Sequence, residues 1–219
     1  MPRMVDVGDL VTTRRALHGV AELIMAGPQY RRSGSIRLAI TPNGFGTTGE
    51  PVLRVDGTEL IAGTRMIPLN GATCGELGTA ADLDAGAPED LYKGGSGVGL
   101  DDVLGVDAGA AELIEESLAK GAEALRRFAP DIEPVLWPEH FDVSISLDEV
   151  NYGVAAGDDE IAEPYAYVGP WGPRYSSFRY TSFWNTSFGA ARRFQDLPRT
   201  DDLYDFFIEG RTRAATERP

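Results

Sequence analysis

The strongest local pattern in the sequence predicts a helix over residues 107–128. Asp107 stands at the N-cap position, where a carboxylate can accept hydrogen bonds from the first free backbone amides. Acidic residues favour the first half of this helix and basic residues its end, as the helix macrodipole prefers. Apolar residues recur at the spacing of one helical face: Ala110, Leu113, Ile114, Leu118, Leu125 and Phe128. The chain therefore has to supply a layer that covers this face.

Short strands are expected to form that layer. Alternating apolar residues between turn signals predict strands over residues 36–40, 52–55, 58–61, 141–147, 152–154, 165–168 and 183–188. The Asp56-Gly57 pair is typical of a tight hairpin turn. A first helix is predicted over residues 13–26, ended by Gly27-Pro28 because proline cannot continue the hydrogen-bond ladder. A last helix is predicted to begin at Thr200.

This order of elements predicts an α+β fold, a largely antiparallel sheet of short strands with about three main helices packed on it. We expect one domain over residues 1–219. Within it, two helix-plus-meander halves, about 12–69 and 107–190, are joined by a glycine-rich connector around Gly94–Gly99. The loose similarity of the two halves has two explanations, a duplication or chance.

Charge excludes two classes of partner. The chain has 20 Lys and Arg against 34 Asp and Glu, a net charge of −14. Nucleic-acid binding depends on basic side chains that displace counterions, and anionic membranes recruit polybasic segments, so we expect neither partner. Cys74 is the one cysteine and cannot form a disulfide within the chain. No signal peptide or membrane-spanning run is visible, which predicts a soluble, cytoplasmic protein.

His140 and Asp142 are the first candidates for chemistry. A strand over residues 141–147 places them near one another on its polar face, where an imidazole oriented by a carboxylate could act as a general base. The same pair could supply two ligands to a divalent metal, with His18 as a third only if the first helix approaches. No metal site is predicted, because such a site usually needs three or four protein ligands and the chain has only two histidines. The structural explanation is that Asp142 anchors the loop before the strand and that His140 is half-exposed beside Trp137.

Aromatic residues are concentrated in the second half. The candidates for ligand contact are Trp137, Asn151, Tyr165, Tyr167, Trp171, Trp184 and Arg174. Aromatic residues dominate core burial, so a compact aromatic core under a long loop is the structural explanation. Tyrosine and tryptophan also combine an apolar face with a polar tip, which suits small-ligand pockets and protein interfaces. Arg174 lies in a segment without carboxylates, where it could hold an acidic group of a ligand.

Two other motifs predict no chemistry. The Gly94–Gly99 stretch lacks the Lys-Ser/Thr ending of a phosphate-binding loop and is interpreted as a flexible connector. Cys74 has no neighbouring base in the sequence, so a passive thiol is expected.

Three segments of the second half resemble a bacterial family of uncharacterised proteins. They are Trp137-Pro138-Glu139-His140-Phe141-Asp142, then Asn151-Tyr152-Gly153 leading to Gly157-Asp158, then Glu163-Pro164-Tyr165-Ala166-Tyr167-Val168. The resemblance covers about residues 135–190. It implies no activity and no cofactor, because that family has no assigned function.

The leading hypothesis is a small-molecule site on the polar sheet face and aromatic loop of residues 137–188. The first alternative is a hydrolase that uses His140 and Asp142, with or without a divalent metal. The second is a protein-interaction module whose contact surface is the aromatic stretch. The sequence names no ligand and no cofactor.

Overall fold

The computed structural model describes residues 5–171 and 180–216. The described residues form a ten-stranded antiparallel sheet with helices packed on it, so the predicted α+β class is confirmed. None of the described helices combines the length and the apolar character needed to cross a membrane.

The first half begins with one continuous helical rod, composed of α1 (Val7–Gly19), the π-helical segment η1 (Val20–Ala26) and α2 (Gly27–Ser33). A meander and a short helix follow: β1 (Leu38–Thr41), β2 (Gly44–Thr47), β3 (Leu53–Asp56), β4 (Glu59–Ala62), β5 (Arg65–Pro68) and α3 (Cys74–Ala81). The hairpin predicted at Asp56-Gly57 is confirmed, because it joins β3 to β4 with Gly57 at a φ of 60°.

The prediction that Gly27-Pro28 ends the first helix is wrong. In η1 the helix changes to π-type hydrogen bonding, and the Gly27 N–H bonds to the carbonyl of Glu22 rather than to that of Leu23. Pro28 has no N–H to offer the Leu23 carbonyl. That carbonyl instead accepts a hydrogen bond from the Gly86 N–H at 2.8 Å. With its backbone groups satisfied in this way, the helix passes through the proline into α2.

The second half repeats a helix and a meander: α4 (Ala108–Phe128), β6 (Val135–Trp137), β7 (Asp142–Leu147), β8 (Val150–Ala155), β9 (Tyr165–Pro170), β10 (Ala190–Arg193), the 3₁₀ turn η3 (Phe194–Asp196) and α5 (Thr200–Thr216). The strand predicted over residues 183–188 is wrong. The Thr181 hydroxyl oxygen accepts hydrogen bonds from the N–H groups of Phe183 and Trp184, which makes a turn there. The last strand is β10 instead.

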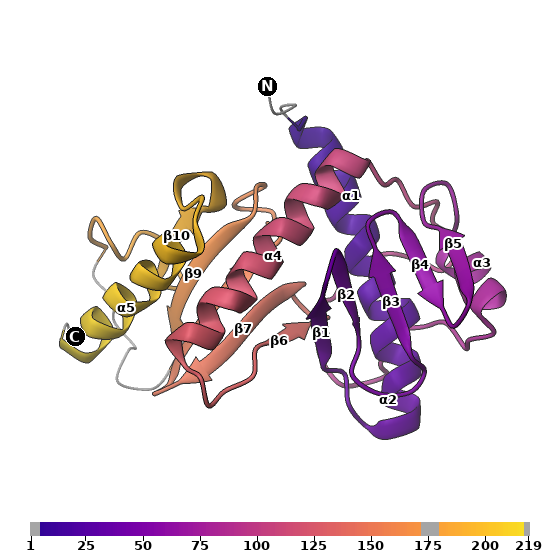
Figure 1. The fold of residues 1–219 in the computed structure, drawn as a ribbon, viewed down its shortest axis with the longest axis horizontal. Coiled ribbons are helices and arrows are strands. Elements are labelled where there is room, and N and C mark those ends of the chain that lie inside the picture. The colour runs from indigo at the N-terminus through magenta and orange to yellow at the C-terminus, as the bar shows by residue number, and fades with distance from the viewer. Residues whose placement is uncertain (1–4, 172–179, 217–219) are drawn as a thin grey trace.

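The two meanders meet at the centre of the sheet. The strand order is β10-β9-β8-β7-β6-β1-β2-β3-β4-β5, and β1 pairs with β6 through Leu38 opposite Leu136. Helix α4 contacts β1 and β2 as well as β7 and β8, and Figure 1 shows it crossing the middle of the molecule. Strands β5 and β10 are the outer edges. A duplication of the two halves stays a prediction.

Helices α4 and α5 cover one face of β7–β9 and leave the other face open. Val143 and Ile145 of β7 are buried in the core, while Asp142 and Ser144 project to the opposite face, as the alternation predicts. Gly121 lets α4 approach this sheet closely, since a Cβ there would lie 2.6 Å from the Val154 side chain. The open face of the second half is therefore where polar side chains of three strands gather.

Candidate functional site

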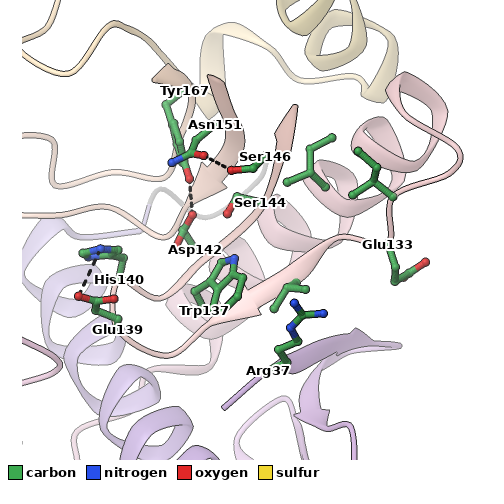
Figure 2. Close-up of a pocket in the computed structure, with 13 residues that line it drawn as sticks. Arg37, Glu133, Trp137, Glu139, His140, Asp142, Ser144, Ser146, Asn151 and Tyr167 are labelled. Atoms are coloured by element: carbon green, nitrogen blue, oxygen red, sulfur yellow. Dashed lines mark hydrogen bonds and ion pairs between the residues drawn. The ribbon is translucent and has the colours of Figure 1, made fainter. Parts of the chain in front are cut away.

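A cleft lined by short polar side chains lies on the open face of β6–β9. Asp142, Ser144 and Ser146 come from β7, Asn151 from β8 and Tyr167 from β9. Figure 2 shows the Tyr167 side chain directed toward Asp142 and the Asn151 side chain directed toward Ser146. The Ser146 hydroxyl donates a hydrogen bond to the Asn151 side-chain oxygen. With a volume of about 440 Å³, this part of the cleft is in the range of small-ligand pockets.

Asp142 lies at the bottom of the cleft and is only 4% exposed. The Tyr167 hydroxyl donates a hydrogen bond to its carboxyl group. Burial raises the pKa of Asp142, and hydrogen bonds from Tyr167 and Ser144 oppose the rise in part. Burial and the neighbouring Asp142 raise the pKa of Tyr167 as well. The pair therefore holds its protons more firmly than the same groups in water, which is typical of binding and catalytic sites.

Gly153 allows Tyr167 to reach Asp142. Strand β8 lies between β7 and β9, and Gly153 stands opposite both Ser144 and Tyr167 in the strand register. A Cβ at position 153 would lie 2.7 Å from the Cε1, Cζ and hydroxyl oxygen of Tyr167. The tyrosine ring thus occupies the space that any side chain at 153 would need. A glycine inside a strand is the sequence signal for such a close approach.

The cleft continues into a part with aromatic walls, about 450 Å³ in volume. The ring centroids of Tyr165, Tyr167 and Phe188 lie 6.2, 6.3 and 6.4 Å apart in their three pairs. The Tyr165 hydroxyl donates a 2.5 Å hydrogen bond to Asp158, and Trp171 stands at the margin with 60% of its surface exposed. The residues shared by the polar and aromatic parts are His140, Asp142, Asn151 and Tyr167. The two parts therefore form one site.

The strand predicted to begin at Phe141 begins at Asp142 instead. His140 therefore lies in the turn before β7 and not on the strand. Phe141 adopts a φ of 52° and its ring is buried. This left-handed residue interrupts the alternation that would have placed His140 on the strand. His140 still lines both parts of the cleft, with a 72% exposed side chain whose Nε2 lies 3.8 Å from the Glu139 carboxylate.

His18 approaches His140 without joining it in a metal site. Both histidines line a neighbouring cleft of about 660 Å³ beside α1. The His18 ring stacks on Phe141, and its Nε2 donates a 2.7 Å hydrogen bond to the Pro138 carbonyl oxygen. Burial lowers the pKa of His18, which favours the neutral ring. Within residues 5–171 and 180–216, no group of three His, Cys, Asp or Glu side chains is arranged to hold a metal ion.

Of three further residues predicted to contact a ligand, one lines the cleft, one lies in the core and one is outside the described residues. Trp137 lines the polar part, with the Arg37 guanidinium 5.8 Å from its ring centroid. Trp184 is 2% exposed and packs edge-on against Phe183, so the structure places it in the hydrophobic core. Arg174 lies outside the described residues.

Sequence reasoning missed the role of Glu22. This carboxylate is buried within η1 and accepts hydrogen bonds from the Tyr92 hydroxyl and from both the backbone N–H and the hydroxyl of Ser96. The glycine-rich connector is therefore fixed to the first helix at Ser96. A single acid in the apolar run Val20–Ala26 was the available signal. The passive thiol expected at Cys74 agrees with its burial, which raises its pKa to about 11.

Comparisons with family models, with curated proteins and with solved structures found no match for this chain. The resemblance of residues 135–190 to a bacterial family stays a prediction. The side chains that line the cleft are thus the basis on which a function can be inferred.

Proposed function

We propose that the chain binds a small molecule in the cleft between Trp137 and Phe188. The observation that carries the proposal is the buried carboxyl group of Asp142, hydrogen-bonded to the half-buried Tyr167 at the bottom of an open cleft. A buried carboxylate costs free energy unless it is paired with a positive charge as well as hydrogen-bonded, and the hydrogen bonds described for Asp142 come from neutral hydroxyl groups. Polar groups on the floor and aromatic walls beside it are the usual composition of a ligand pocket.

The two parts of the cleft suit a ligand with two kinds of surface. The serine hydroxyls of β7 and the Asn151 amide offer hydrogen bonds to polar groups. Tyr165, Tyr167 and Phe188 offer apolar ring surface next to them. A ligand with a polar end and a flat apolar end would contact both parts at once.

An enzymatic function of the same cleft is the second candidate. A carboxyl group with a raised pKa can act as a proton donor, and the exposed ring of His140 lies along the same cleft. These two groups could transfer protons to and from a bound substrate, as in the predicted hydrolase. The metal-dependent version has no support among the described side chains.

A substitution that fills the cleft tests the proposal. Ser146 is exposed on the cleft wall, so Ser146→Trp would occupy the polar part and leave the Asp142–Tyr167 hydrogen bond in place. The matched control is Thr64→Trp, an exposed turn position in the first half. Binding of a library of small fragments would be measured by ¹⁵N chemical-shift changes.

We expect fragments to shift the amides of β7–β9 in the wild type and in Thr64→Trp, and to lose most of this effect in Ser146→Trp. If no fragment shifts these amides in the wild type, or if Ser146→Trp binds the same fragments equally well, the proposal is wrong.

A further inference from the structure

Among the described residues, the acidic and basic side chains that line the aromatic part of the cleft are all acidic, apart from His140. Its described lining includes the carboxyl groups of Asp142 and Asp158 and no lysine or arginine. His140 is the one described lining residue there that can become positively charged. The whole chain adds a net charge of −14, which raises the local concentration of small cations near such a cleft.

Asp142 lacks a fixed positive partner among the described residues that contact it. Its hydrogen bonds come from neutral hydroxyl groups, those of Tyr167 and Ser144. The nearby His140 is mostly exposed to water, which weakens any charge interaction with the buried carboxyl. A buried carboxylate without a counter-ion is strongly destabilised, so a positive charge delivered by a ligand would have a large effect at this position.

Aromatic rings next to this carboxyl group favour the same kind of ligand. Tyr165, Tyr167 and Phe188 form a cluster in which each ring centroid lies within 6.4 Å of the other two. The faces of aromatic rings attract ammonium groups, and more strongly where water is excluded. An ammonium group could therefore contact Asp142 while the apolar body that carries it lies against the rings.

We propose that the ligand of this cleft is a cationic amine whose ammonium group pairs with Asp142 and whose apolar body packs on the rings of Tyr165, Tyr167 and Phe188. This inference rests on the proposed binding function and names its ligand class. The other titratable groups beside Asp142 are Tyr165 and Tyr167 of β9 and His140 of the preceding turn.

Three probes of similar shape and different charge test the inference: benzylamine, benzyl alcohol and benzoate. Dissociation constants would be measured by calorimetry and by ¹⁵N chemical shifts at pH 7.5. We expect the wild type to bind benzylamine about tenfold more tightly than benzyl alcohol, because a desolvated charge contact of about 1.4 kcal/mol corresponds to that ratio. Benzoate should bind least tightly.

Two variants locate the charge that matters. Asp142→Asn keeps the shape of the side chain and should reduce benzylamine affinity to that of benzyl alcohol. Glu209→Gln removes the same charge from α5, which packs on the opposite face of the sheet, and should leave benzylamine affinity unchanged. Should Asp142→Asn fail to fold, the ¹³Cγ resonance of Asp142 in the wild type replaces it as the readout. Benzylamine should shift this resonance, because its ammonium group pairs with the carboxyl group, and benzyl alcohol should shift it much less.

The outcomes separate this inference from the function on which it rests. If benzyl alcohol or benzoate binds in the cleft as tightly as benzylamine, or if benzylamine leaves the Asp142 ¹³Cγ resonance unshifted, the ligand is not a cation paired with Asp142. The inference then fails while the binding function stands. If no fragment of any charge binds in the cleft, both proposals fail.

Discussion

Gly153 is the residue on which the geometry of the site depends most directly. A methyl group at this position would collide with the Tyr167 ring at 2.7 Å. We expect Gly153→Ala to displace the ring, to break its hydrogen bond to Asp142 and to lower the free energy of unfolding by about 1–3 kcal/mol, the usual cost of overpacking. Urea unfolding measures the stability, and the Tyr167 side-chain resonances report the ring.

The control for this change is Gly169→Ala in the adjacent strand. A Cβ at position 169 would have its nearest neighbour, the Phe188 carbonyl oxygen, at 3.5 Å, which is an ordinary contact. This variant should keep the position of the Tyr167 ring. If Gly169→Ala lowers the free energy of unfolding and displaces the Tyr167 ring as much as Gly153→Ala does, contact with this ring is not the reason why position 153 requires glycine.

The buried carboxyl group of Glu115 in α4 should make the free energy of unfolding depend on pH. It is buried, and its Oε1 has no hydrogen-bond partner among the residues that the structure describes. Burial, followed by the charges of Asp56 and Glu112, raises its pKa from 4.5 to about 7, although a hydrogen bond from the Gly57 backbone opposes the rise. The folded state therefore holds this proton more tightly than the unfolded chain does. The contribution of Glu115 is most favourable below about pH 4.5 and is lost as the pH rises toward 7.

The Glu115→Gln variant removes this titration. We expect it to unfold at a higher urea concentration than the wild type at pH 8, and the difference to shrink as the pH falls from 7 toward 5. The difference between the two proteins is the quantity to follow, since other carboxylates titrate in both. A constant difference across this range would mean that Glu115 is ionised in the fold.

The residues of the site were predictable to different degrees. Alternation along β7 was enough to place Asp142 on the polar face. It did not show that Tyr167 crosses β8 to meet Asp142, because that contact depends on strand register and on the empty position at Gly153. The alternation also predicts Phe141 within the strand, because an apolar side chain gives no sign that its backbone has a positive φ.

Among the elements, the π-helical segment depends on one close backbone contact. Gly27 lies so near the segment after α3 that a Cβ there would be 1.7 Å from the Gly86 carbonyl oxygen. We expect Gly27→Ala to push the Gly86 backbone away from the helix, so that the Leu23 carbonyl loses its hydrogen bond from the Gly86 N–H. The free energy of unfolding should fall by more than about 2 kcal/mol. Hydrogen exchange at the Gly86 amide is the direct measurement.

Gly49→Ala is the comparison for this change, because the nearest atom to its Cβ is the Gln29 Oε1 at 3.8 Å. It should leave exchange at Gly86 slow. Slow exchange at Gly86 in Gly27→Ala as well would contradict the role assigned to the contact.

Local signals predicted elements well where one residue decides the conformation. Asp107 correctly indicates the start of a helix, and the Asp56-Gly57 pair correctly indicates a hairpin. Pro28 is misleading, because the Leu23 carbonyl that it leaves unbonded is satisfied by Gly86, which is distant in the sequence. No local pattern contains that partner. The Thr181 turn likewise depends on hydrogen bonds that β-strand alternation does not encode.

At the scale of the whole molecule, the two halves share one core. Phe45 of the first half packs edge-on against Phe141 of the second, and the His18 ring of the first half stacks on Phe141 as well. We expect a chain cut in the exposed stretch Glu89–Leu91 to remain a single particle. Size-exclusion chromatography after cleavage at an engineered protease site there tests this expectation.

The cut chain should differ from the intact one in a defined way. Because its pieces would associate rather than fold as one chain, its unfolding temperature should rise with protein concentration. Two separately eluting fragments in native buffer would instead show that each meander is an independent unit.

The two edges of the open sheet are places where other copies of the chain could add strands. A ten-stranded sheet that does not close has two edge strands, β5 and β10, beside which strands of other copies could add. At β10 the Asn185 side chain already occupies the N–H and the carbonyl oxygen of Ala191. Both edge strands span four residues; Arg65 begins one and Pro68 ends it, and the other finishes in Arg192-Arg193. Short length, proline and adjacent positive charges all oppose the addition of another strand. Both edges of this sheet are thus poor templates for strands from other copies of the chain.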